Sequence, residues 1–130
     1  MDLPAWPDGT VAVLSTAAGP PHAIPVSTAV RSGPATVHFA LALRRDSLAR
    51  LREDPHCALT VLATEVAITA QGTASVVQED ERIAFVRLDV ESMQDHGQAT
   101  FAIESGVGWR WTDPDAERAD AELRERLRAL

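Results

Sequence analysis

The sequence predicts a mainly β protein, a closed or partly open β-barrel of six to seven antiparallel strands with only two helices. Three observations support this fold class. Apolar runs of strand length recur along the chain, Gly- and Pro-rich turns separate them, and only two segments show helical spacing. A chain of 130 residues is expected to form one domain, residues 1–130.

The first two strands are expected to form a hairpin. Residues 10–17 are apolar and β-branched, which predicts a buried strand, and a Gly-Pro-Pro turn follows. Residues 22–31 alternate between larger apolar and smaller side chains, which predicts a second strand. Pro25 lies inside this run and has no N–H to donate to a neighbouring strand. We therefore expect an edge strand or a bulge there, with backbone groups open to a heterocyclic ligand.

A short helix is expected between the third and fourth strands, residues 36–43 and 56–63. Its apolar positions Leu48 and Leu51 lie three residues apart, and Asp54-Pro55 ends it because the residue before proline avoids helical geometry. The helix is thereby placed beside the mouth of the barrel.

The later strands are predicted at residues 66–77, 84–91 and 100–104. Gly72 inside the first of these predicts a bend or bulge. The second alternates strictly, which predicts one buried face and one solvent-exposed face. Its expected inner residues are Ala84, Val86, Leu88 and Val90, and its expected outer residues are Phe85, Arg87, Asp89 and Glu91.

A C-terminal helix is expected over residues 113–130, with Pro114 at a position where its missing N–H costs nothing. An apolar stripe predicts that this helix packs on the barrel or on a partner subunit. The polar side predicts the pairs Asp120–Arg124 and Glu122–Arg126. Just before the helix, Trp109 and Trp111 alternate and are expected on opposite faces. The stripe consists of Ala116, Ala119, Leu123, Leu127 and Leu130.

The charge balance excludes general binding to nucleic acid or to anionic membranes. Nineteen acidic residues against twelve arginines, with no lysine, give a net charge of −7, whereas polyanions require a basic field. The N-terminus has neither a basic stretch nor a long apolar run, so a cytoplasmic protein is expected.

The arginines are nevertheless concentrated near the short helix. Arg44, Arg45, Arg50 and Arg52 fall within nine residues, beside the expected helix N-caps Asp46 or Ser47. Basic side chains at a helix amino end favour a phosphate, so a small phosphorylated ligand is expected there. The alternative interpretation is that these arginines pair with surface carboxylates.

Other reactive side chains give no catalytic or metal motif. Cys57 lies in an apolar strand and is expected to be a buried, inert thiol. The four histidines lack metal-ligand spacing, so no metal is expected, although His22 is a possible contact to a ligand ring. No catalytic residue can be named, and in an enzyme of this kind a cofactor would perform the redox chemistry.

Residues 10–77 resemble the pyridoxamine 5'-phosphate oxidase-like FMN-binding split-barrel family. The matching stretches, in order, are VAVLSTAAGPPHAIPVSTAV, VHFALALRRDS, LARLREDPHCALTVLA and AITAQGTASVV. The resemblance implies a split β-barrel that forms a homodimer, with two flavin mononucleotides (FMN) in clefts between the subunits.

The resemblance also implies which residues contact the flavin. Residues Pro25, Val26, Ser27 and Thr28 would lie against the isoalloxazine ring. The ribityl phosphate would be held by Arg44, Arg45, Ser47 and Arg50.

Three departures from the family pattern shape the functional expectation. Many members have a lysine near Ser47, whereas this chain has none, and arginines would replace it. Only residues 78–82 separate two strands where family enzymes often insert a helix. The extra C-terminal arginine and histidine contacts of a true pyridoxamine phosphate oxidase are also missing. The expected function is therefore a flavin-dependent oxidoreductase for an unknown small molecule. The alternatives are a deazaflavin-dependent reductase and a non-catalytic flavin or haem binding or storage protein.

Overall fold

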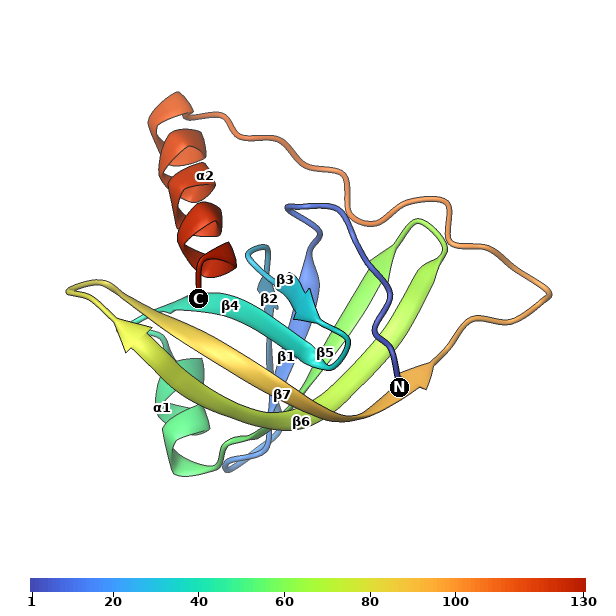
Figure 1. Cartoon of the computed structure of the whole chain (residues 1–130), viewed down its shortest axis with the longest axis horizontal. Helices are drawn as coiled ribbons and strands as arrows, with labels where there is room; N and C mark the ends of the chain where they lie inside the picture. Colours follow the sequence, from blue (N-terminus) through green and yellow to red (C-terminus); the bar gives the residue numbers. More distant parts are fainter.

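The computed structural model describes all 130 residues and contains one seven-stranded antiparallel sheet and two helices (Figure 1). This architecture confirms the mainly β prediction. Neither α1 nor α2 has the length and hydrophobicity of a membrane-spanning helix. The strands are β1 Ala12–Thr16, β2 His22–Val26, β3 Val30–Gly33, β4 Thr36–Ala42, β5 His56–Ala63, β6 Val66–Glu79 and β7 Ile83–Asp95, and the helices are α1 Asp46–Glu53 and α2 Pro114–Arg128.

The strand order is β2-β1-β5-β6-β7-β4-β3, so two strands that are consecutive in sequence form opposite edges of the sheet. The predicted single strand 22–31 is therefore wrong: it is broken after Val26 and resumes at Val30. Residues 27–29 carry the chain from one edge to the other, and Thr28 Oγ1 accepts a hydrogen bond of 3.0 Å from the Ala40 N–H of β4. Pro25 does lie in an edge strand, as predicted, because β2 has a neighbour only on its β1 side.

The core fills the inside of the curled sheet. Its 22 buried residues include Leu14, Phe39 and Leu59, together with the predicted helix residues Leu48 and Leu51. The inner face of β7 is also as predicted, with Ala84, Val86, Leu88 and Val90 buried.

Gly72 marks the predicted bulge in β6. The register of β6 against β7 shifts between Gln71 and Gly72. A Cβ at Gly72 would lie 1.9 Å from the Asp89 carbonyl oxygen, so no larger residue fits without moving the backbone.

The outer face of β7 differs from its prediction at Phe85. Its ring is fully buried rather than solvent-exposed, because α2 packs over this part of the sheet. Leu127 of α2 contacts Phe85 and Val30, and the Arg126 guanidinium lies 4.5 Å from the Phe85 ring centroid. Of the two expected positions for this helix, on the barrel or on a partner subunit, the structure shows α2 packed on the barrel of its own chain.

The ion pairs of α2 are only partly as predicted. Asp120 and Arg124 form the expected pair at 2.5 Å, and burial raises the pKa of the Asp120 carboxyl. Arg126 pairs with Asp80 of the β6–β7 turn at 3.1 Å, in place of Glu122. The tertiary contact with Asp80 and the Phe85 ring takes Arg126 away from its helical neighbour. Two residues of the predicted apolar stripe, Ala119 and Leu130, remain exposed.

The segment between β7 and α2 is irregular and runs around the barrel (Figure 1). The predicted strand at residues 100–104 is absent, because only isolated backbone contacts form there, such as Glu65 N–H to the Ile103 carbonyl oxygen at 2.9 Å. Trp109 and Trp111 were expected on opposite faces. Their rings instead meet edge to face at 5.1 Å, since the segment is not a strand.

Candidate functional site

The amino end of α1 presents two arginines that have no internal partner. Arg44 and Arg45 are exposed, and neither forms an ion pair with a carboxylate. Arg45 occupies the N-cap position, and no side chain caps the helix. The Leu48 N–H already donates to the Arg45 carbonyl oxygen at 3.1 Å, so the N–H groups of Asp46 and Ser47 and the two guanidinium groups are available to an anion.

Asp46 does not cap the helix, which corrects one part of the prediction; Ser47 does not cap it either. Asp46 is the first residue of α1, and its carboxylate accepts a hydrogen bond of 2.8 Å from Arg50 Nε one turn later. This hydrogen bond lowers the pKa of the Asp46 carboxyl, with the charges of Arg50 and His22 adding to the effect.

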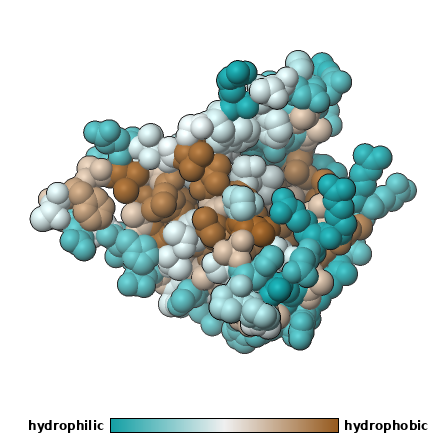
Figure 2. Space-filling view, turned by 180° about the vertical axis from the view of Figure 1, so that it is seen from behind, coloured by the Kyte–Doolittle hydropathy of each residue, from teal (hydrophilic) through white to brown (hydrophobic).

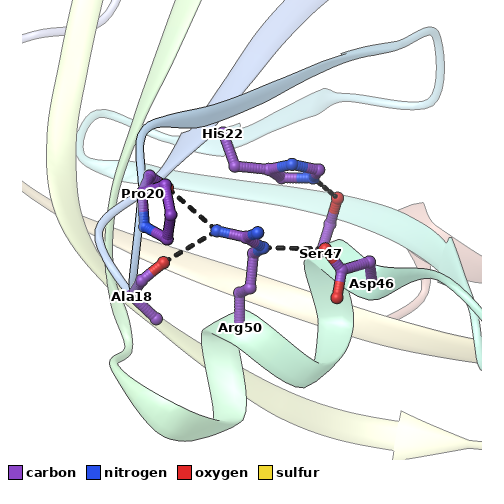
Figure 3. Close-up of polar contacts among 6 residues, drawn as sticks. All are labelled: Ala18, Pro20, His22, Asp46, Ser47 and Arg50. Atoms are coloured by element: carbon purple, nitrogen blue, oxygen red, sulfur yellow. Dashed lines mark hydrogen bonds and ion pairs between the residues drawn. The ribbon is translucent and has the colours of Figure 1, made fainter.

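Arg50 is held by the protein itself (Figure 3). In addition to Asp46, its Nη1 donates to the carbonyl oxygens of Ala18 at 2.8 Å and Pro20 at 2.9 Å. The guanidinium thereby ties the β1–β2 turn to α1. Its assignment as a phosphate ligand remains a prediction, and in this arrangement a phosphate would compete with three internal acceptors.

Ser47 lies against the hairpin rather than in solvent (Figure 3). Its side chain is 1% exposed, and its Oγ shares a hydrogen bond of 3.1 Å with Nε2 of half-buried His22 in β2. The structure therefore brings together Ser47 of the helix, a predicted phosphate ligand, and His22 of the edge strand, which the sequence indicated only as a possible ring contact.

The four residues expected beside a flavin ring do not share one face. Pro25 is exposed, Val26 is 6% exposed within the core cluster, and Ser27 and Thr28 are half-buried. The side chain of Val26 points away from any external ligand, so only its backbone is open to one. Thr28 lies beside Ala40 of β4. Ala40 itself is two residues before the end of β4 and four residues before Arg44.

One basic residue near this site, Arg82, was not identified from the sequence. Arg82 belongs to the β6–β7 turn, which the sequence shows only as a charged connection. Its carbonyl oxygen accepts from the Leu43 N–H at 2.8 Å, and Arg82 lines a cavity together with Arg44. No local pattern could have shown this, since the contact joins residues 39 positions apart and depends on the β4–β7 register.

Other reactive groups lie outside this site. Cys57 is buried, as predicted, and desolvation raises the pKa of its thiol to about 12. No group of three or more His, Cys, Asp or Glu side chains is arranged to hold a metal ion.

Comparisons with known proteins identify relatives of this fold. The family model described as pyridoxamine 5'-phosphate oxidase matches residues 4–109. No curated protein matches the chain.

Solved structures share the fold at low sequence identity. A candidate pyridoxamine 5'-phosphate oxidase from Listeria innocua has a TM-score of 0.56 and 17% identity, over 67% of this chain and 88% of the other. An FAD-binding protein from Mesorhizobium loti has a TM-score of 0.54 and 14% identity, over 65% and 81%. An F420 reductase has a TM-score of 0.56 and 10% identity, over 66% and 90%.

Proposed function

Because this chain belongs to the pyridoxamine 5'-phosphate oxidase family, we propose that it binds FMN and uses it to oxidise or reduce a small molecule. The observation that carries the proposal is the pair Arg44 and Arg45 at the uncapped amino end of α1. In a protein of net charge −7, exposed arginines without carboxylate partners at a helix amino end fit a phosphate dianion.

In this proposal the residues of the chain position the flavin and supply positive charge to its phosphate. Arg45 and the first-turn N–H groups of α1 would bind the ribityl phosphate, with Arg44 beside them. The segment Pro25–Thr28 would lie along the ring, where Ser27 and Thr28 are half-buried and Val26 offers its backbone. Bound FMN would supply hydride or single-electron transfer. The F420 reductase with this fold makes a deazaflavin the second candidate cofactor.

We further propose that the protein is a homodimer and that the outer face of the sheet around β1 and β5 is the interface. Adjacent strands present rows of paired side chains on this face, and its central residues carry no charge. Glu91 and His56 lie at its border, beside Ala58 and Gln71. Figure 2, the view from behind, shows apolar side chains across the middle of the molecule with hydrophilic ones around them. The residues of this uncharged face are Val13, Ser15, Ala23, Pro25, Ala58, Thr60, Leu62, Thr69, Gln71, Ser92 and Gln94.

The proposed function is tested with the purified protein and FMN. Titration followed by flavin fluorescence measures the affinity, and loss of the oxidised flavin absorbance on addition of NADH or NADPH shows whether the bound flavin is reduced. Tight binding together with reduction supports an oxidoreductase, whereas binding without reduction by either donor or by a reduced deazaflavin supports a storage protein. Absence of FMN binding by the intact protein contradicts the proposal.

A further inference from the structure

Most arginines of this protein are neutralised by carboxylates, and the exceptions gather in one region. Four of the twelve arginines form no ion pair, and three of these four are Arg44, Arg45 and Arg82. They lie where β4 leads into α1 and where β6 turns into β7, two segments joined by the hydrogen bond from Leu43 N–H to the Arg82 carbonyl oxygen. The arginines that do form ion pairs are Arg31, Arg50, Arg52, Arg87, Arg118, Arg124, Arg126 and Arg128.

Two of these unpaired arginines line a cavity of about 530 Å³. Arg44 and Arg82 supply its positive charge, and Ala42, Leu43 and Ile83 supply apolar wall. Glu81 is the single carboxylate in the lining. The volume is that of a site for an organic molecule rather than for one inorganic ion.

The other acidic residues near the β6–β7 turn already bind partners within the protein. Asp80 accepts from the N–H groups of Arg82 and Ile83, which lower the pKa of its carboxyl, and it also pairs with Arg126 of α2. Glu79 pairs with Arg52 at 2.6 Å. The contacts of Asp80 and Glu79, including the ion pair with α2, therefore hold the turn in place. The Arg82 guanidinium has no carboxylate partner and is available to a ligand.

We propose that this cavity is a second anion subsite, in which Arg44 and Arg82 bind a phosphate or carboxylate group next to the amino end of α1. For the source of that anion the inference rests on the proposed function. One source is a cofactor tail that extends beyond a single phosphate, and the other is an acidic substrate bound beside FMN. In both cases the bound ligands present a second anionic group in addition to the phosphate at the amino end of α1.

The probe for the subsite is inorganic pyrophosphate, because it requires no flavin. Titration is followed by amide NMR shifts of the intact protein, with and without FMN. We expect the amides of Leu43, Arg44, Arg82 and Ile83 to shift. Arg82→Ala should weaken binding about tenfold, the size of one charge-assisted hydrogen bond. Glu81→Gln should strengthen it, because it removes the opposing charge.

The matched control is Arg110→Ala, which removes the remaining arginine without an ion pair, outside this cavity. It should leave pyrophosphate binding unchanged. The proposal is overturned if pyrophosphate shifts none of the four amides, or if Arg82→Ala binds it as tightly as the natural protein.

Two further titrations identify the source of the anion. If Arg82→Ala weakens binding of FAD but not of FMN, the subsite holds a cofactor tail. The subsite serves an acidic substrate if two results occur together. Arg82→Ala binds FAD and FMN as tightly as the natural protein does, and Arg82→Ala still weakens the binding of pyrophosphate to the FMN-loaded protein. If the natural protein binds pyrophosphate at these amides but does not bind FMN, the subsite proposal is supported and the proposed function is contradicted.

Discussion

The Ser47 hydroxyl of α1 and the His22 imidazole of β2 share a hydrogen bond of 3.1 Å, which joins the short helix to the edge strand of the sheet. Arg50 makes a second connection between the same parts, through the carbonyl oxygens of Ala18 and Pro20. Two of the polar side chains near the amino end of α1 therefore hold the fold together. The exposed Arg44 and Arg45 remain as the groups best placed to bind an anion.

Arg45→Ala should weaken FMN binding by about 1–3 kcal/mol, because a charge-assisted hydrogen bond to the phosphate is lost. The measurement is FMN titration by fluorescence quenching. Arg110→Ala, which also removes an exposed arginine without an ion pair, should bind FMN like the natural protein. Equal dissociation constants for Arg45→Ala and the natural protein would remove Arg45 from the proposed phosphate site.

Arg50→Ala should destabilise the folded protein by about 2 kcal/mol, because the hydrogen bonds to two turn carbonyls are lost. Urea unfolding measures the change in the free energy of unfolding. Arg52→Ala is the matched control, since Arg52 makes only an exposed ion pair with Glu79 and such pairs contribute little. Similar midpoints for the two variants would show that Arg50 does not tie the turn to the helix.

Gly72→Ala should destabilise the protein by at least about 3 kcal/mol, because the new methyl group would overlap the backbone of β7. Gly108→Ala is the control, since nothing lies within 4 Å of a Cβ at that position. Thermal unfolding followed by circular dichroism compares the two. A Gly72→Ala protein that melts with the natural protein would contradict the close approach of β6 and β7.

The Cys57 thiol should resist alkylation by iodoacetamide at about pH 8, because the thiolate is the reactive form and burial raises the pKa to about 12. In the unfolded chain the same thiol ionises near pH ~8.5. Its contribution to stability is therefore complete below that pH and is lost as the pH rises towards the folded value. Mass spectrometry with and without denaturant measures the two rates, which should differ strongly. Equal rates would mean that the thiol is accessible in the folded protein.

Leu62→Arg should convert the proposed dimer to a monomer, because it places a charge on the uncharged face where Leu62 is 46% exposed. Sedimentation velocity of the natural protein should give about twice the chain mass of 14.0 kDa. Leu130→Arg changes an apolar residue of similar exposure, 42%, just after α2, which packs against β3 and β4, and this variant should remain dimeric. A natural protein that sediments as a monomer while it binds FMN fully would refute the proposed homodimer and the FMN site between subunits that the family resemblance implies.

The sequence by itself determined where most of the strands lie and where α1 ends, although it also predicted a strand at 100–104 that does not form. Leu48 and Leu51 face the core because of their helical spacing, and Asp54-Pro55 stops the helix because of the geometry that proline imposes. The edge position of Pro25 and the bulge at Gly72 were also predictable, since each depends on the chemistry of a single residue.

Only the tertiary structure decided which surfaces of these elements meet. It separated β2 from β3 onto opposite edges of the sheet, buried Phe85 under α2, and engaged Arg50 with the hairpin turn. It also placed Arg82 beside Arg44. These relationships join residues far apart in the chain, and they depend on strand order and register. Local patterns do not specify strand order and register, because each strand can satisfy its alternation of inner and outer side chains with more than one neighbour.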